Sequence, residues 1–380
     1  MASEPAEGYE LPPLDGPEGS SGLIAPRDDV AMMEGYYSPQ LEVEVRLNTN
    51  EAPEAPPAGF VEELRTGIDG IAFNRYPDRE AVELRRAVAE LHGVTLDEVY
   101  CANGSNEVLQ SLLLAYGGPG RAVALFEPTY ALHSHIARVT GTAVISGRRD
   151  EEYLIEEGEL DRVLSEGARD FGGQNPVLTF VCSPNNPTGR VEPTERIVSV
   201  LERAPGLVVV DEAYGQFAPN SALELREGHD NLVVVRTFSK TWSLASLRLG
   251  YAIARPEVVE ALFAVTLPYH LDSLKQLAGR LALAYRDDMV ERVERLKAER
   301  ARLMAALLSM ALEVCPSDAN FILFRPRARD AKEVWSDLLA ASVLVRDIST
   351  VPHLEGFLRV TIGSPEENDA FLAALRASLA

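Results

Sequence analysis

The stretch PVLTFVCSPNNPTGRVEPTERIVSVLERAPGLVVVDEAY, residues 176–214, contains the pattern that decides the fold. Near each end it has an apolar run of strand length, at 176–182 and at 207–212, and the residues between these runs follow a helical pattern. A strand, a helix and a second strand in this order are typical of a parallel sheet that is covered on both faces. The stretch therefore predicts one strand-helix-strand unit of a larger α/β fold.

The same alternation continues along the chain in both directions. Further apolar runs of strand length lie at 121–126, 142–147, 231–238 and 249–254. An amphipathic helix is predicted at 81–93, because its apolar residues share one face and Gly93 follows the last of them. We predict an α/β fold with a mostly parallel sheet, and such sheets bind ligands at the carboxyl ends of their strands.

Composition suggests further divisions of the chain. Residues 1–28 are rich in Pro, Gly, Glu and Ser, which predicts a flexible acidic extension. A helical stretch from about 274 to 312 connects the strand-rich part to a smaller C-terminal α+β unit. The expected domains are a large one at 56–270 and a small one at 271–380.

Composition and charge restrict the possible functions. Hydrophobic residues make up 46% and charged residues 25% of the 380 residues, which is the ordinary globular balance. The 36 basic residues against 58 acidic ones give a net charge of −22, so we expect no nucleic-acid partner, because phosphate backbones need a positive surface. The three cysteines have no CxxC spacing and no apolar run reaches the roughly 18 residues of a membrane span. We therefore expect a cytoplasmic protein without a membrane partner.

Four polar segments lie at 103–107 (NGSNE), 182–189 (CSPNNPTG), 210–214 (VDEAY) and 236–242 (RTFSKTW), and the last three stand at the carboxyl ends of predicted strands. The first opens a helix, whose free N–H groups bind anions, and the second is a rigid turn that can present an asparagine amide. A carboxylate in the third could pair with a protonated pyridine nitrogen, and a lysine in the cationic fourth would have a lowered pKa suited to imine chemistry. Taken alone, the first segment is more typical of a helix N-cap, the third contains a common turn former, and the lysine of the fourth is more typical of a surface residue. The eight-residue string of the second is more specific than an ordinary strand-to-helix turn.

Together and in this order, the four segments resemble the fold-type I aminotransferases that use pyridoxal 5′-phosphate (PLP). The resemblance runs from about Tyr36 to the C-terminus and implies a seven-stranded sheet, a homodimer, and an arm at 29–55 that contributes to the active site and the dimer. It implies catalytic roles for Lys240 as the Schiff-base lysine, Asp211 at the pyridine nitrogen and Tyr214 with Asn186 at the phenolic oxygen. The other cofactor residues that it implies are Ser105, Asn106, Thr237, Ser239 and Arg248 at the phosphate, Tyr130 on the ring, and Tyr76 from the neighbouring subunit.

Within this class the chain is most similar to histidinol-phosphate aminotransferases of actinobacterial type. The likeness rests on YSPQLEV (37–43), RLNTNE (46–51), NRYPD (74–78), LPYHLDSLKQ (267–276) and LRVTIGSPEENDAFL (358–372). It implies histidinol phosphate and glutamate or 2-oxoglutarate as substrates, and Asn50 as a substrate-binding residue. One departure is Ala52, where the family usually has Asn or Tyr near the substrate, and this weakens the substrate assignment while leaving the PLP assignment intact.

Two arginines bear on what is bound. Arg359 shares a strand face with Phe357 and Thr361, and Arg346 is similarly placed on the preceding predicted strand. From the residues alone, structural ion pairs are the favoured interpretation for both. The resemblance assigns Arg359 to the α-carboxylate and Arg346 to the substrate phosphate.

Several alternatives remain open from the sequence. The runner-up is a broad aromatic aminotransferase, followed by a PLP-dependent decarboxylase of a phosphorylated amino acid and by a non-catalytic ligand sensor. His133 and His135 are two residues apart in a predicted helix and no carboxylate completes a set with them, so we expect no metal site. Cys182 lies beside the NNPTG turn without an evident base and is expected to be a packed residue.

Overall fold

The computed structural model describes residues 24–31, 33, 35, 39–166 and 175–380. The chain divides into two units, residues 1–37 and 38–380, and the described part of the first contains one short helix, α1 (Asp28–Ala31). The predicted acidic extension at 1–28 lies almost entirely outside the described residues. The predicted boundaries at 29, 56 and 271 stay predictions.

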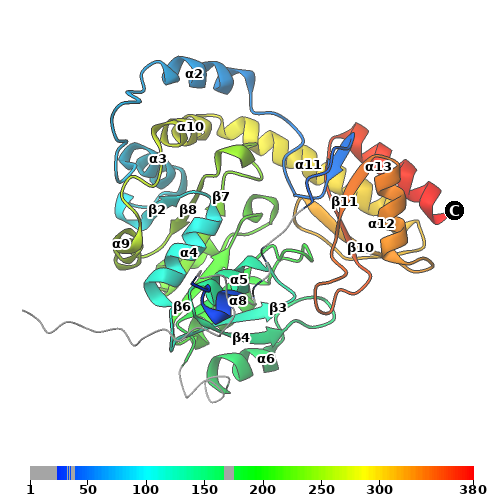
Figure 1. The fold of residues 1–380 in the computed structure, drawn as a ribbon, viewed down its shortest axis with the longest axis horizontal. Helices are drawn as coiled ribbons and strands as arrows, with labels where there is room; N and C mark the ends of the chain where they lie inside the picture. The colour runs from blue at the N-terminus through cyan, green and yellow to red at the C-terminus, as the bar shows by residue number, and fades with distance from the viewer. Residues whose placement is uncertain (1–23, 32, 34, 36–38, 167–174) are drawn as a thin grey trace, which may run out of the picture. The chain divides into compact units, whose positions relative to one another are not determined.

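A seven-stranded sheet forms the centre of the second unit, with the strand order β2-β8-β7-β6-β5-β3-β4 (Figure 1). Its strands are β2 (Val99–Ala102), β3 (Ala122–Glu127), β4 (Ala143–Arg148), β5 (Leu178–Cys182), β6 (Leu207–Asp211), β7 (Leu232–Thr237) and β8 (Gly250–Ile253). β8 pairs antiparallel with β2 and β7, and the other pairings are parallel. The mostly parallel seven-stranded sheet is confirmed, and β2 is the strand that the sequence did not predict.

Helices cover both faces of this sheet, as the two-sided burial of its strands requires. On β6, Val209 packs into the cluster that contains side chains of α4, α5 and α9, whereas Val208 and Val210 pack with α6 and α8 on the other face. The five helices are α4 (Ser105–Tyr116), α5 (Leu132–Val139), α6 (Glu157–Asp161), α8 (Thr194–Arg203) and α9 (Pro256–Val265).

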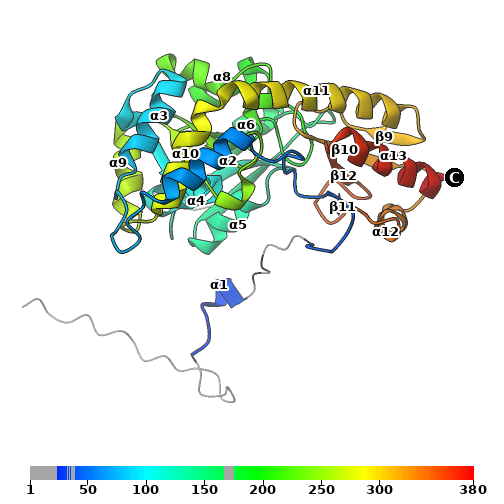
Figure 2. The same ribbon diagram turned by 90° about the horizontal axis from the view of Figure 1, so that it is seen from above.

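Four further helices are α2 (Ala58–Ile68), α3 (Val82–His92), α10 (Ser273–Ala284) and α11 (Arg286–Leu308). α3 matches the predicted amphipathic helix and ends at Gly93, whose φ of +64° suits glycine. The predicted helical stretch at 274–312 is two helices, because Tyr285 leaves the helical conformation, and β9 begins at Leu312. Figure 2 shows α11 running toward the second sheet.

The second sheet has five strands in the order β1-β11-β12-β10-β9. They are β1 (Val45–Leu47), β9 (Leu312–Val314), β10 (Phe321–Pro326), β11 (Val343–Asp347) and β12 (Leu358–Thr361), and the accompanying helices are α12 (Ala331–Ala340) and α13 (Pro365–Leu379). The C-terminal strands and helices match the sequence prediction. β1 was not predicted, and it brings residues 45–47 into this sheet by pairing parallel with β11.

Five short helical segments complete the described elements. They are η1 (Leu96–Glu98), η2 (Arg162–Glu166), η3 (Gly215–Phe217), η4 (Ala222–Gly228) and η5 (Ala245–Leu247). Within the described ranges, the length and hydropathy that a membrane-crossing helix requires are met by none of the helices.

Candidate active site

Lys240 follows β7 in a turn at the carboxyl edge of the large sheet. Its Nζ donates a hydrogen bond to the backbone carbonyl of Thr49, at 3.0 Å. Burial lowers the pKa of Lys240 to about 8, and the positive charges of Arg359 and Arg248 act in the same direction, whereas Glu51 opposes them. A substantial fraction of this amine is therefore neutral near physiological pH, as the predicted imine chemistry needs.

Asp211 is the last residue of the neighbouring strand β6 and is almost fully buried. Its Oδ1 accepts a hydrogen bond from the backbone N–H of Ala213 at 3.0 Å, and its Oδ2 lies 3.1 Å from Nε2 of His133. His133 is buried in α5 and stacks on the ring of Phe180, with 4.9 Å between the ring centroids. In the tautomer that carries its proton on Nε2, His133 would donate a hydrogen bond to the Asp211 carboxylate and orient it.

The sequence did not predict a role for His133. Its position near the start of α5, three residues after the predicted site residue Tyr130, is the signal that could have suggested one. The rings of Tyr130 and His133 are 5.4 Å apart in an edge-to-face arrangement.

Tyr214 links three segments of the chain at the same edge. Its hydroxyl oxygen accepts hydrogen bonds from Nδ2 of Asn50 at 2.9 Å and from Nδ2 of Asn186 at 3.4 Å. Burial raises the pKa of Tyr214 above its usual value. Nζ of Lys240 lies 5.9 Å from the centroid of the Tyr214 ring, so the predicted catalytic lysine and phenol share one site.

The predicted phosphate-binding residues converge where β7 and β8 meet the start of α4. The Thr237 hydroxyl lies 3.0 Å from the Ser239 hydroxyl, which accepts a hydrogen bond from Nη1 of Arg248 at 3.2 Å. Gly104 caps α4 with φ +82°, and a Cβ on Gly104 would lie 2.8 Å from Nη2 of Arg248. A Cβ on Gly250 would likewise lie 2.3 Å from the backbone N of Ser105. This close approach forms a cationic cradle at the start of a helix, which suits a phosphate group.

The two predicted aromatic residues occupy different places. The Tyr130 hydroxyl donates a hydrogen bond to Oδ1 of Asn106 at 3.2 Å, so Tyr130 lies beside the start of α4. Tyr76 is 80% exposed and stacks on Tyr269, with 4.4 Å between ring centroids. The structure therefore gathers Tyr130 into the site of this chain and leaves Tyr76 on the surface.

The predicted substrate arginines lie directly opposite each other on adjacent antiparallel strands, Arg346 on β11 and Arg359 on β12. Arg359 is buried, and its guanidinium donates hydrogen bonds to Oδ1 of Asn186 at 2.5 Å and to the carbonyl of Asn48 at 3.0 Å. Thr361, on the same face of β12, donates a hydrogen bond to Oδ1 of Asn50. The face of β12 that carries Arg359 and Thr361 therefore points toward Asn186 and Asn50.

Asn50 is held by both halves of the site. Its backbone N–H donates to the Thr361 hydroxyl at 3.0 Å, its carbonyl accepts from Nδ2 of Asn320 at 3.2 Å, and its side chain reaches Tyr214. The φ of Asn50 is +56°, a left-handed conformation that asparagine tolerates better than most residues. The segment around Asn50 therefore joins the two sheets at the site.

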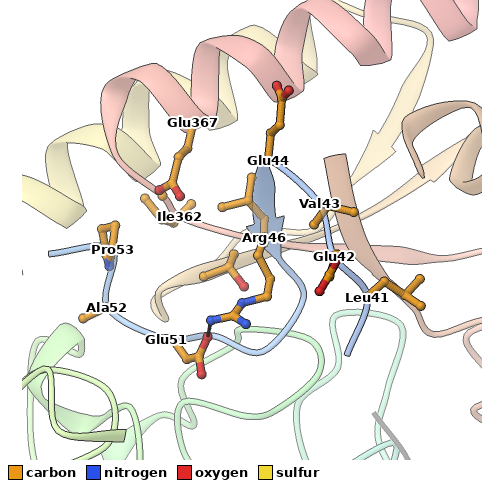
Figure 3. A pocket seen from close by; sticks show the side chains of 13 residues that line it. Leu41, Glu42, Val43, Glu44, Arg46, Glu51, Ala52, Pro53, Ile362 and Glu367 are labelled. Carbon is orange, nitrogen blue, oxygen red and sulfur yellow. Dashed lines mark ion pairs between the residues drawn. The ribbon is translucent and has the colours of Figure 1, made fainter. Parts of the chain in front are cut away.

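Residues 51–53, which follow Asn50, line a cavity of about 490 Å³ (Figure 3). Its wall contains Ala52, Thr361 and an ion pair between Arg46 and Glu51, whose charged atoms are 3.6 Å apart. Ala52 presents only a methyl group to this space. Ala52, the departure from the family pattern, therefore lies in the wall of this cavity. Thr361, in the same wall, is hydrogen-bonded to Asn50.

The histidines and cysteines are the remaining candidates for metal binding or nucleophilic chemistry. Over the residues that the structure describes, His, Cys, Asp and Glu side chains form no group of three or more that could hold a metal ion. Cys101, Cys182 and Cys315 are buried free thiols. Burial raises the pKa of Cys182, so a packed, unreactive thiol describes it better than a nucleophile does.

The described residues fit PLP on the chemistry of their donors. A buried lysine with a lowered pKa suits the aldehyde, the cradle of Arg248, Ser239 and the Gly104 turn suits the phosphate, and a buried, oriented carboxylate suits a protonated ring nitrogen. These groups lie at the carboxyl ends of adjacent strands, where the parallel sheet was expected to place them.

Comparison with known proteins gives consistent matches over most of the chain. The family "Aminotransferase class I and II" matches residues 42–375. Curated histidinol-phosphate aminotransferases from Streptomyces avermitilis and Frankia casuarinae are 47% and 43% identical over 363 and 368 residues; these alignments cover 92% and 93% of this chain and 95% and 90% of the relatives. The crystal structure of histidinol-phosphate aminotransferase from Sinorhizobium meliloti in complex with pyridoxal-5′-phosphate has a TM-score of 0.83 at 22% identity, with 95% of this chain and 98% of that chain covered.

Proposed function

Because the chain belongs to the class I and II aminotransferase family, we propose that it transfers the amino group of L-histidinol phosphate to 2-oxoglutarate, with PLP as its cofactor. The products are imidazole acetol phosphate and L-glutamate, and the reaction belongs to histidine biosynthesis. The observation that carries this proposal is the convergence of Lys240, Asp211 and the phosphate cradle with two arginines that face each other on the second sheet. We further propose a cytoplasmic location, which the three free thiols support.

We assign the covalent and proton-transfer steps to Lys240. When bound, PLP supplies an electron sink that stabilises negative charge developing at the substrate Cα. With a pKa of about 8, Lys240 has enough neutral amine to attack an aldehyde carbon. Lys240 would hold the aldehyde carbon of the cofactor through Nζ, and once the substrate amine takes its place there, the free Nζ would accept the proton from the substrate Cα.

The remaining large-sheet residues hold the cofactor in place. Asp211 is assigned to the proton on the ring nitrogen, and His133 acts as a positioning residue because it fixes the orientation of the Asp211 carboxylate. Tyr214 and Asn186 are assigned to the phenolic oxygen, and Tyr130 to the ring face. Ser105, Asn106, Thr237, Ser239 and Arg248 are assigned to the phosphate.

The arginine pair is assigned to the substrate anions. Histidinol phosphate has no α-carboxylate, and its phosphate is attached through the carbon that takes the place of that carboxylate. Two guanidinium groups opposite each other, Arg359 and Arg346, match the double charge of a phosphate better than one would. With glutamate as substrate, the two arginines would bind different groups: Arg359 the α-carboxylate and Arg346 the side-chain carboxylate.

We also propose that the functional unit is a homodimer in which Tyr76 reaches the cofactor phosphate of the partner subunit. Four large apolar side chains from two segments support an interface here: Phe73, Tyr76, Leu267 and Tyr269 are 76%, 80%, 78% and 41% exposed. An exposed group of aromatic and aliphatic side chains is typical of protein interfaces.

Mixing two defective variants tests the shared site. A Lys240→Ala protomer lacks the catalytic lysine and a Tyr76→Ala protomer lacks the residue lent to its neighbour. If Tyr76 serves the partner, a mixed dimer contains one site with both defects and one intact site, so activity returns on mixing. If mixing restores nothing although mixed dimers form, Tyr76 does not reach the partner's site.

Reductive trapping tests the assignment of the cofactor lysine. Borohydride treatment of the purified holoenzyme should bleach its visible absorbance and attach the cofactor covalently to the peptide that contains Lys240, as peptide mass spectrometry would detect. Attachment to another lysine would overturn the assignment, and the absence of any trapped cofactor would count against PLP chemistry altogether.

A further inference from the structure

The segment LPYHLDSLKQ, residues 267–276, resembles the family pattern, but none of the steps of the proposed reaction is assigned to it. It leads into α10, whose N-cap Asp272 accepts a hydrogen bond from the backbone N–H of Lys275 at 2.8 Å. Nζ of Lys275 lies 3.1 Å from Oδ2 of Asp272, so the Lys275 side chain folds back over the start of α10. This places its ammonium group beside the residue that precedes the phosphate cradle.

Lys275 donates a hydrogen bond from Nζ to Oδ1 of Asn103, at 2.8 Å. Asn103 has further partners: its Nδ2 donates to Oε2 of Glu107 at 2.8 Å and to the carbonyl of His270 at 3.0 Å, and its backbone N–H donates to the same Glu107 oxygen. Both ends of the Asn103 amide are therefore fixed, with Lys275 holding the oxygen and Glu107 and His270 holding the nitrogen.

The position of Asn103 determines where the start of α4 points. The next residue, Gly104, is the N-cap of α4 with φ +82° and lies so close to the Arg248 guanidinium that a Cβ would collide with it. Ser105 and Asn106 follow directly, and their N–H groups belong to the first turn, which has no intrahelical acceptors. A rotation of Asn103 would thus move the donors of the phosphate cradle relative to Arg248.

Charge gives Lys275 a second effect on the same turn. Glu107 places a carboxylate in the first turn of α4, and such a charge disfavours a phosphate at the helix start. The Lys275 ammonium, joined to Glu107 through the Asn103 amide, partly offsets that charge. With a side chain only 24% exposed, Lys275 is screened less than a fully exposed lysine would be.

We propose that Lys275 is a positioning residue for the phosphate cradle, which sets the affinity for PLP by fixing Asn103 and thereby the Gly104–Ser105 turn. This inference rests on the proposed cofactor. Because Lys275 acts on the phosphate side alone, its influence depends on the phosphate group of the ligand.

Titration of the apoenzyme with PLP and with pyridoxal, which lacks the phosphate, tests the inference. Lys275→Met keeps the side-chain length and removes the charged donor, so the dissociation constant for PLP should rise about three- to tenfold, the scale for one partly exposed charge-assisted hydrogen bond. The constant for pyridoxal should stay within about twofold of wild type. Lys275→Arg, which keeps a cationic donor, should recover part of the loss.

Lys297→Met provides the matched control, because Lys297 is a similarly exposed lysine that pairs with Glu294 on α11. It should leave both constants unchanged. Equal PLP affinity in Lys275→Met and wild type, or an equal loss for PLP and pyridoxal, would overturn the inference while leaving the proposed function intact. Failure of the wild-type apoenzyme to bind PLP would instead overturn the proposed function.

Discussion

The carboxyl edge of the seven-stranded sheet and the arginine-bearing face of the five-stranded sheet serve the site in different ways. On the first, Asp211, Tyr214 and Lys240 are each hydrogen-bonded to a residue from a distant part of the sequence. The partners are His133, Asn50 and Thr49, respectively. At the second, Arg346 and Arg359 place like charges opposite each other, an arrangement that an anion between them would stabilise. Under the proposed function, the first sheet fixes the chemistry and the second selects the substrate. Changes on the two sheets should therefore have separable effects.

The largest effect is expected on the first sheet. Lys240→Ala should reduce transamination by at least about 10³-fold with every amino donor, because no other described side chain is assigned its nucleophilic and proton-transfer roles. The variant should remain folded, because burial of the charged Lys240 side chain is itself unfavourable and its removal should cost the core little stability. Turnover assays and thermal unfolding check both parts, and near wild-type turnover would contradict the mechanism.

On the second sheet, Arg359→Ala should weaken both half-reactions by about 3 to 5 kcal/mol in kcat/KM, the scale for removing a buried charged hydrogen-bonding partner. The effect reaches both substrates because each brings an anion to this position. Arg327→Ala, an exposed arginine directly after β10, is the control and should change neither. A loss confined to one half-reaction would show that Arg359 does not serve both substrates.

A smaller and more selective effect is expected from the opposite arginine. Arg346→Ala should cost histidinol phosphate about 2 to 4 kcal/mol in kcat/KM and phenylalanine much less, because phenylalanine has a single anion for Arg359 to bind. Glutamate should also be affected through its side-chain carboxylate. If the preference for histidinol phosphate over phenylalanine survives this change, Arg346 is not the phosphate reader.

The smallest effect concerns pH and returns to the first sheet. A lysine pKa lowered to about 8 means that the neutral amine is gained as pH rises through 8, so PLP capture by the apoenzyme should accelerate about tenfold from pH 7 to pH 9 and then level off. A lysine with its ordinary pKa would give about a hundredfold rise over this range without levelling. Stopped-flow absorbance of the apoenzyme separates the two profiles.

Much of the large sheet could be predicted from local pattern. β3 to β8 are apolar runs, so the bounds of these strands were predicted within one or two residues. The roles assigned to the polar residues at the ends of β5, β6 and β7 stay predictions. β2 was missed because its apolar run is only four residues long and is bounded by Glu98 and Asn103, whereas the run that contains β8 extends over 249–254. β1 was missed because its pairing with β11 joins residues about 300 positions apart.

Within the site, the residues missed are those whose role depends on distant contacts. His133 was considered only as a metal ligand, because its contact with Asp211 spans 78 positions in the sequence. The carbonyl of Thr49 reaches Lys240 across 191 positions. The opposition of Arg346 and Arg359 depends on a strand register that residue spacing alone did not provide.

The most direct test of this division of labour is a half-reaction assay of the PLP form with glutamate, histidinol phosphate and phenylalanine as single-turnover amino donors. The account predicts conversion by histidinol phosphate and glutamate, with kcat/KM for histidinol phosphate at least about tenfold above that for phenylalanine, since a second guanidinium bound to the doubly charged phosphate is worth more than about 1.4 kcal/mol. Conversion by phenylalanine as efficient as that by histidinol phosphate would contradict it and favour an aromatic aminotransferase.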